Sequence, residues 1–427
     1  IVNMKFLNKE INKSPLFGLN GSDTINSLRN EALNEFNKQG LPNKNWEEWK
    51  YSDFSSLNKM SFAFGVRKNI SSLPDSFPEI NDTNQIVFLN GYFQKKLSNI
   101  SSKISVKTIE EAYKSDSELI HNLLSPNSNP FHNINSAMIN SGLMIIVNDN
   151  EIINDPIHII NYTTDLDEPL MNHPLFIIKL GNGSEASIID HYYGSTNIEY
   201  WQNSVTKIKL SKNSSLKHFR LQEESASSIH IADTNYIVEK DAQLNAFHLA
   251  TGASKYRQNI NVNLNDIGAS STINGLCLTK DNQQHDHFIT INHLKEKCSS
   301  KQLFKYILSD SSLGIFNGKV IVKKGAQQTD AKQSTKNLIL NDSAVAHSNP
   351  QLEIYADEVK CSHGSTTGQL DQDAIFYMRS RGIDYKTAQL ILINGFAKEV
   401  LKIISEKNVN QYINKQLSFW LENAGIT

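Results

Sequence analysis

Cysteine is scarce in this chain of 427 residues, which holds only Cys277, Cys298 and Cys361. An odd number of cysteines without CxxC spacing argues against a disulfide framework and against a four-thiolate metal site within the chain. We therefore expect a reducing compartment, and a cytoplasmic location unless an organellar transit segment has been removed.

Long apolar runs and an excess of charge of one sign are also missing. No segment approaches about 18 consecutive apolar residues, and the first residues lack the basic and apolar regions of a signal peptide. The 42 Lys and Arg residues nearly balance the 44 Asp and Glu residues, so the net charge is only −2. Without a basic field, we expect the chain to bind neither nucleic acid nor a membrane surface.

Common enzyme motifs are absent as well. The only candidate phosphate loop, Gly181-Asn182-Gly183, lacks the third glycine and precedes a strand-like segment, so we interpret it as a β-turn. The GxxxxGK[ST], GxSxG and HExxH patterns do not occur. The sequence therefore gives no support to nucleotide hydrolysis, α/β-hydrolase or zincin chemistry.

Residues 1–82 are predicted to form an N-terminal helical domain. Apolar side chains recur at helical spacing over residues 22–39, and Gly40 follows as a stop signal. Aromatic residues then crowd an otherwise polar stretch: Trp46, Trp49, Tyr51 and Phe54. We expect these aromatic side chains to anchor the helical domain on a larger one.

Residues 83–366 are predicted to be an all-β region, because short runs of β-formers alternate with Asn, Asp and Gly. Small-residue corners recur at intervals of 28, 28 and 27 residues, with a weaker match two steps later: Ala186, Ser214, Ala242, Ala269 and Ala326. A fixed period of roughly 20 to 50 residues is typical of a solenoid. A sandwich would instead place turns every 8 to 12 residues or so. We therefore predict a parallel β-helix core.

Residues 367–427 are predicted to form a C-terminal helical domain, with Gly382 ending its first helix. The next helix carries a broad apolar face that includes Phe396, Val400 and Ile404. This face either packs on the end of the solenoid or forms a docking surface for a partner. We treat these three residues as candidate partner-binding residues.

Two histidines, His285 and His287, form a candidate metal site. On a strand they point to the same face, and His293 or Cys298 could complete a zinc or iron site. The spacing is not a standard ligand pattern, and hydrogen-bonded structural histidines are the alternative.

Cys361 and His363 form a second candidate site, and their spacing places both side chains on one face of an extended segment. A thiolate beside an imidazole can bind iron, zinc or an iron-sulfur cluster. Two ligands cannot close such a site, so the pair indicates an interface with another chain. A buried structural cysteine and a hydrogen-bonded histidine remain the alternative.

Several long segments resemble one protein family. The run from Cys361 to Leu401 resembles the most recognisable block of the SufB/SufD family of iron-sulfur cluster assembly proteins, and is most like its SufD branch. The preceding block is similar at FNGK, TDAKQ and PQLEI, which here span 316–319, 329–333 and 350–354. The EEWKYSDF segment at 47–54 resembles an element near the start of SufD proteins.

The resemblance implies a right-handed parallel β-helix with flanking helices, and a non-catalytic scaffold subunit of the SUF system. In that family SufD pairs with SufB, and each binds one copy of the ABC-type ATPase SufC through its C-terminal helices. It implies a transient iron-sulfur cluster or iron shared with SufB, no tightly bound cofactor, and a possible homodimer in isolation. His363 corresponds to the histidine implicated at the SufB interface, and Cys361 matches the same element more weakly.

Two alternatives remain open at this stage. The chain could be the SufB paralogue, although its KCSHGST element and WKYSDF segment favour SufD. The chain departs from the family pattern in a minor way at Ser365 and Thr367, where the family often has alanine and valine. A polysaccharide-active β-helix protein would share the fold by analogy only, and neither a signal peptide nor an acidic run supports it.

Overall fold

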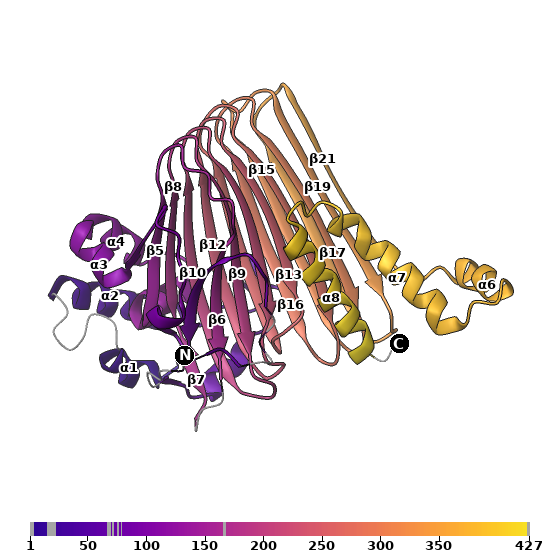
Figure 1. The fold of residues 1–427 in the computed structure, drawn as a ribbon, viewed down its shortest axis with the longest axis horizontal. Helices are drawn as coiled ribbons and strands as arrows, with labels where there is room; N and C mark the ends of the chain where they lie inside the picture. Colours follow the sequence, from indigo (N-terminus) through magenta and orange to yellow (C-terminus); the bar gives the residue numbers. More distant parts are fainter. Residues whose placement is uncertain are drawn as a thin grey trace.

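The computed structural model describes residues 4–14, 23–65, 70, 72–74, 77, 79–164 and 168–424. Two tall sheets face each other across a solenoid that is built coil by coil along the chain (Figure 1). Helices cover its first coils, and other helices lie against one face near its last coils (Figure 1). This architecture confirms the predicted β-helix core with helical parts at both ends.

From β8 onward, successive strands alternate between the two sheets. The first sheet contains β1 (Ala63–Phe64), β4 (Ile104–Thr108), β5 (Ser141–Val147), β7 (Leu170–Asn172), β8 (Pro174–Leu180), β10 (Tyr200–Leu210), β12 (Ile229–Val238), β14 (Lys255–Leu264), β16 (Gln284–His293), β18 (Leu313–Val322) and β20 (Val345–Ile354). The second contains β2 (Asn84–Leu89), β3 (Tyr92–Phe93), β6 (Ile157–Thr163), β9 (Glu185–Gly194), β11 (Ser215–Glu223), β13 (Gln243–Ala250), β15 (Ser270–Thr279), β17 (Ser299–Leu308), β19 (Thr329–Ile339) and β21 (Val359–Gly368). The pairs from β5 and β6 onward are parallel, as a solenoid requires.

The predicted corners fit the observed register only in part. Ser214, Ala242 and Ala269 each directly precede a strand of the second sheet, and the strand starts pair with one another. The first corner is Ser184 rather than Ala186, because Glu185 pairs with Ser215. The weaker match at Ala326 is also wrong. Asp330 of β19 pairs with Ser299 at the start of β17, so the corner residue of this coil is Thr329.

Residues with positive φ precede these corners and let the chain turn. Asn213, Asp241, Gly268, Lys297 and Gln328 all have φ between 54° and 74°. Asn, Asp and Gly tolerate this left-handed conformation better than other residues, which explains their frequency between the strands. Alternate residues of each strand then point into the solenoid and form its main apolar core, which includes Ile208, Tyr236, Val262, Ile289 and Phe316.

The N-terminal helices are α1 (Leu7–Glu10), α2 (Asp23–Gln39), α3 (Ile109–Ser115), α4 (Ser117–Leu124) and α5 (Pro130–Met138), with short 3₁₀ turns η1 (Ile11–Lys13), η2 (Glu47–Trp49), η3 (Ser55–Lys59) and η4 (Lys95–Leu97). Helix α2 confirms the predicted first helix. Helices α3 to α5 lie inside the segment that we predicted to be all β, and this part of the prediction was wrong. Their start signals are clear: Thr108 and Glu111 form a capping box, and Asn129 caps α5 before Pro130.

The aromatic segment after α2 anchors the N-terminal part on the solenoid, as predicted. Trp49 and Phe54 are buried, and both rings contact Phe131 of α5. Tyr51 reaches the last coil and stacks on His347 of β20, with 4.2 Å between ring centroids. The segment therefore runs from the first helices to the far end of the first sheet.

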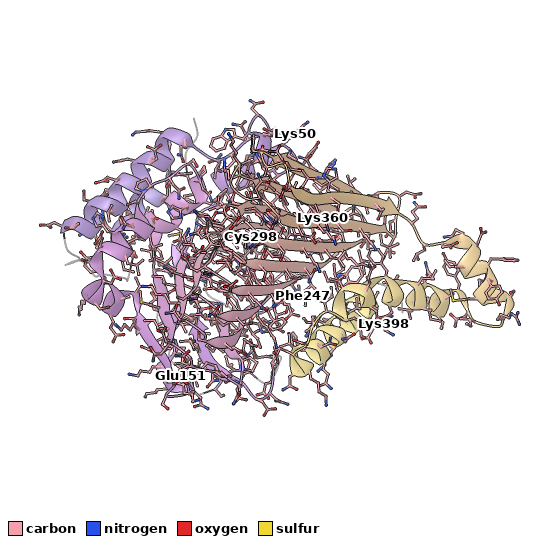
Figure 2. The ribbon with its side chains drawn as sticks, turned by 90° about the horizontal axis from the view of Figure 1, so that it is seen from above. Lys50, Glu151, Phe247, Cys298, Lys360 and Lys398 are labelled. Atoms are coloured by element: carbon pink, nitrogen blue, oxygen red, sulfur yellow. The ribbon has the colours of Figure 1, made fainter. Side chains whose placement is uncertain are left out.

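The C-terminal helices are α6 (Gln372–Ser380), α7 (Tyr385–Leu401) and α8 (Lys407–Asn423). Asp371 and Asp384 cap α6 and α7 through their side chains, and Gly382 has φ of 86° after α6. Helices α7 and α8 pack on the outer face of the second sheet, whereas α6 projects away from the solenoid (Figures 1 and 2). No helix in the described ranges is long and apolar enough to cross a bilayer.

Candidate functional site

Both sheets end at the same open edge of the solenoid. In the described chain β20 pairs only with β18, and β21 pairs only with β19. Most residues of β21 are exposed, and those of β20 are mostly half-buried, whereas the central strands are largely buried. Such edge strands present unpaired N–H and C=O groups to another chain. We call β20 and β21 together the open end.

Cys361 and His363 both lie on β21 of the open end. Cys361 pairs with Ala331 of β19, and His363 pairs with Gln333. Because Ala331 and Gln333 are buried inward-facing residues, Cys361 and His363 also face the interior of the solenoid. The structure confirms that their side chains lie on one face. His363 is exposed because no further coil covers it.

Cys361 is half-buried at one corner of the open end, where it packs beside a small apolar cluster. Burial raises the pKa of its thiol, and the nearby carboxylate of Asp330 raises it further. No hydrogen bond or ion pair joins Cys361 to His363, and the described residues contain no group of three or more potential metal ligands. Within this part of the chain, the pair is therefore an incomplete ligand set.

Polar side chains line the interior just behind the open end. Gln302 of β17 and Gln333 of β19 are in register with His363, and the amide atoms of both glutamines are buried without hydrogen-bond partners. Asn337 donates to the hydroxyl groups of Ser348 and Thr367, at 3.0 and 2.9 Å. These residues were not identified from the sequence, although glutamines that recur at about one coil length could have indicated them.

His285 and His287 face the interior in the middle of the solenoid, and each already has partners. The Nδ1 of His285 lies 3.4 Å from the Cys277 sulfur, and its Nε2 lies 2.6 Å from the Gly252 carbonyl oxygen. The Nδ1 of His287 lies 2.8 Å from the Tyr306 hydroxyl. Burial lowers the pKa of His285 to about 4 and that of His287 to about 3. These contacts favour structural roles over the metal site that we considered.

Comparison with known proteins shows to which family this chain belongs. A profile described as "SUF system FeS cluster assembly, SufBD core domain" matches residues 162–396, and one described as "SufBD protein N-terminal region" matches residues 12–159. The chain belongs to the SufBD family. The N-terminal region of the family thus extends past our predicted boundary at residue 82 and includes α3 to α5.

Individual relatives agree with this assignment. An iron-sulfur cluster assembly SufBD family protein of Synechocystis is 31% identical over 378 residues, which cover 84% of this chain and 83% of that protein. The iron-sulfur cluster assembly protein SufD of Escherichia coli is 28% identical over 385 residues, or 90% of each chain. The chloroplastic protein ABCI7 of Arabidopsis thaliana is 34% identical over 252 residues, which cover 58% of this chain and 52% of that protein. This SufBD chain is therefore an iron-sulfur cluster assembly protein similar to SufD.

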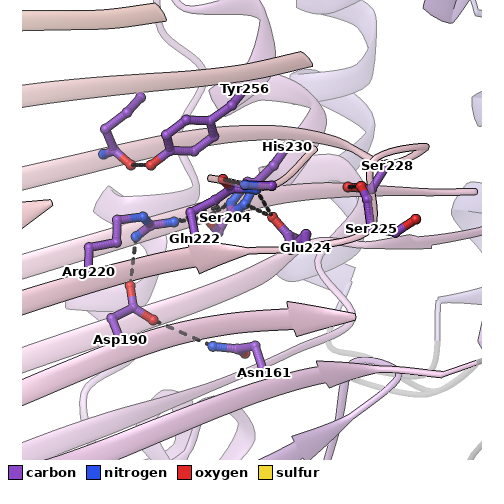
Figure 3. Close-up of polar contacts among 12 residues, drawn as sticks. Asn161, Asp190, Ser204, Arg220, Gln222, Glu224, Ser225, Ser228, His230 and Tyr256 are labelled. Atoms are coloured by element: carbon purple, nitrogen blue, oxygen red, sulfur yellow. Dashed lines mark hydrogen bonds and ion pairs between the residues drawn. The ribbon is translucent and has the colours of Figure 1, made fainter. Parts of the chain in front are cut away.

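A buried charged cluster crosses the interior of the SufBD core (Figure 3). The Nη1 of Arg220 donates to Asp190 at 2.6 Å, and its Nη2 donates to the Ser204 hydroxyl at 2.9 Å. The Nδ1 of His230 lies 2.5 Å from a carboxylate oxygen of Glu224. All five side chains are buried, and Arg220 and Asp190 form an ion pair. This cluster lies deep inside the middle coils of the solenoid, away from the open end.

Cys277 and Cys298 have structural positions. Cys298 occupies the corner before β17, and its thiol donates to the Asp266 carbonyl oxygen at 3.2 Å. Cys277 has no exposed surface, and burial raises the pKa of both thiols. His293, the other proposed ligand, lies 2.9 Å from the Ser300 hydroxyl.

The three candidate partner-binding residues lie largely beneath the C-terminal helices. Val400 has no exposed surface and Ile404 is buried, so neither fits a free docking surface. Phe396 is half-buried, and its ring lies 4.2 Å from the ammonium group of Lys305. These residues attach the helices to the second sheet, which corrects our expectation for Val400 and Ile404.

Other apolar residues of the C-terminal region are exposed. The large ones are Phe376, Tyr377, Tyr385, Ile391, Ile403 and Phe419. Phe376 and Tyr377 lie on α6, the helix that projects from the solenoid in Figure 2, where Lys398 marks the neighbouring α7. Together with Tyr385, the first residue of α7, they form a surface that we call the α6 patch.

Proposed function

We propose that this chain is the SufD-type scaffold subunit of an iron-sulfur cluster assembly complex and that it contributes no catalysis of its own. The family and the similarity to SufD support this role. The observation that carries the proposal is the open end, where two edge strands each have one unpaired side and β21 carries the exposed imidazole of His363.

The open end would pair with a SufB-like paralogue. Edge strands of ten residues each can extend both sheets by main-chain hydrogen bonds to a second solenoid. Val345 and Ile354 add exposed apolar surface on β20. In the absence of that paralogue, the same strands would allow two copies of this chain to pair.

His363 would contribute to a shared site at this junction. Iron and iron-sulfur clusters are the cargo of the assembly reaction, and each iron generally needs about four ligands. His363 can supply one nitrogen, and the half-buried Cys361 can supply one sulfur only after it loses its proton. The remaining ligands would come from the paralogue across the junction.

The α6 patch would dock the ABC-type ATPase of the system. Phe376 and Tyr377 are exposed on α6, which stands clear of the solenoid, and Tyr385 is exposed at the start of α7. Aromatic residues are enriched at protein interfaces. The buried faces of α7 and α8 are occupied by their contacts with the second sheet.

Copurification with the two partners tests the proposal. The double variant Val345→Asp, Ile354→Asp places two charges on the open end and is expected to release the SufB-like subunit. Ile152→Asp is the matched control, since Ile152 is similarly exposed but lies near the first coils. Retention of the SufB-like subunit by the double variant would contradict pairing through the open end.

The ATPase contact is tested in the same way. Phe376→Asp in the α6 patch should release the ATPase and leave the SufB-like subunit bound. Phe419→Asp on α8 changes an equally prominent exposed ring outside the patch and should release neither. Loss of the ATPase from the Phe419 variant alone would assign the contact to α8.

A further inference from the structure

Gln333 lies one coil behind His363, and its amide is buried without a partner. Gln302 lies one coil deeper in the same inward-facing column. Each glutamine exposes 3% of its surface, and the Nε2 and Oε1 atoms of both lack hydrogen bonds within the described chain. A buried amide without a partner is costly, so such groups in native proteins are nearly always satisfied by protein atoms or ordered water.

Gly318 on the facing sheet fixes where the Gln333 amide lies. A Cβ atom on Gly318 would overlap the Nε2 of Gln333, so the glutamine side chain spans the interior from β19 to β18. Only a residue without a side chain leaves this space. The amide is therefore held across the mouth of the solenoid, directly behind the position of His363.

His363 is the polar neighbour of Gln333 on the open side. It has no hydrogen-bond partner among the described residues, and the two residues are paired in adjacent strands. Adjacent strands lie about 4.8 Å apart, a spacing that a small tilt or one bridging water can span with hydrogen bonds. We propose that Gln333 is a positioning residue for His363: its Oε1 accepts a hydrogen bond from one imidazole N–H, directly or through one trapped water.

This bond would select one tautomer of His363. A neutral imidazole binds a metal or accepts a proton through the ring nitrogen that carries no hydrogen, and a hydrogen bond at the other nitrogen determines which one that is. Gln302 can support this arrangement. A hydrogen bond from its amide to Gln333 would polarise the Gln333 amide and strengthen the hydrogen bond between Gln333 and His363. This inference rests on the proposed role of His363 and adds the residues that orient it.

The test is the tautomer ratio of His363 in the full-length chain, read from the imidazole ¹⁵N chemical shifts of a ¹⁵N-histidine-labelled sample. The His363→Gln variant identifies the resonance. We expect one tautomer to predominate in the native chain. In Gln333→Met, which keeps the side-chain length but removes the acceptor, the ratio should move to that of a solvent-exposed imidazole. An unchanged ratio in Gln333→Met would overturn the proposal.

Two further variants make the result specific. Lys332→Met changes the adjacent residue, which is exposed on the outer face of the same strand, and should leave the ratio unchanged. Gln333→Asn keeps the amide on a shorter side chain, so its tautomer ratio should resemble that of Gln333→Met. It replaces Gln333→Met in the test if that variant does not fold. A shift in Lys332→Met equal to that in Gln333→Met would also overturn the proposal.

The rate of cluster formation separates this inference from the proposed function. In the assembled complex, Gln333→Met should lower the rate by roughly tenfold, the lower range for loss of a residue that orients a metal ligand. If His363→Ala forms clusters at the normal rate, the proposed role of His363 fails. The tautomer measurement needs neither partner nor cluster, so it still decides whether Gln333 orients the imidazole.

Discussion

Arg257 stacks on Trp49, with its guanidinium carbon 4.2 Å from the centroid of the indole ring. The same guanidinium pairs with the buried carboxylate of Asp286 and donates to the Glu48 carbonyl oxygen at 3.1 Å. Ser52 also donates to Asp286. The N-terminal aromatic segment is therefore attached to β14 and β16 by the contact of the Trp49 ring with the buried Arg257–Asp286 ion pair.

Trp49→Ala is expected to detach this segment. The variant leaves a large cavity beside Phe131 and uncovers Arg257, which should lower the free energy of unfolding by about 3–5 kcal/mol. Denaturant unfolding measures the loss, and limited proteolysis should show faster cleavage between α2 and β2. Glu48→Ala is the control, because it keeps the backbone carbonyl that Arg257 uses. Equal stability of the Trp49 variant and native chain would contradict this role.

The attachment of α7 should depend on pH through Glu399. Its carboxylate lies 2.5 Å from Lys305 and 2.8 Å from Lys336, and these hydrogen bonds lower the pKa of Glu399 below its ordinary value of 4.5. A carboxyl group with a lowered pKa stabilises the folded chain above its unfolded pKa, and this contribution is lost as pH falls through the folded value.

As the pH falls into the acid range, Glu399→Gln should therefore lose less free energy of unfolding than the native chain does. Urea unfolding followed by circular dichroism between about pH 3 and pH 6 measures this difference. At neutral pH the variant should lose stability, because Lys305 is largely buried beneath the helix. Glu422→Gln, at an exposed position of α8, should reproduce the native profile. An identical acid dependence in the Glu399 variant would exclude this ion pair as the cause.

The three cysteines should differ in reactivity with iodoacetamide. Cys277 and Cys298 expose 0% and 1% of their surface, so neither should react until the chain unfolds. Cys361 is half-buried, and its raised pKa leaves little thiolate, so it should react in the native chain but more slowly than a free thiol. Mass spectrometry of tryptic peptides distinguishes the three sites. Rapid labelling of Cys277 in the native chain would contradict its structural role.

The repeat was readable from the sequence because each coil needs a small residue and a left-handed residue at its corner. Ser214 and Ala242 follow Asn213 and Asp241, and these pairs carry the period. The number of residues per coil nevertheless varies more than the sequence indicated, because the turns between strands differ in length. The helices within residues 109–138 were missed because β-forming runs flank them, although the caps at Thr108 and Asn129 mark their starts.

The candidate site was predictable only where it resembles a motif. Cys361 and His363 share a face because side chains alternate along any strand. Gln333 could not be assigned to their site without the register, because its burial depends on Gly318 in a different strand. Similarly, the apolar face with Val400 was correctly identified, but amphipathicity alone does not tell a partner surface from an intramolecular contact.

Cluster formation by the assembled complex with His363→Ala tests the central claim most directly. The complex of this chain with a SufB-like subunit and the ATPase would be supplied with iron and a sulfur source, and cluster absorbance followed over time. His347→Ala is the matched control, since His347 also lies on the open end but stacks on Tyr51. We predict that both variants assemble normally and that only His363→Ala slows cluster formation, by about tenfold or more. Cluster formation at the native rate in the His363→Ala complex would contradict the account.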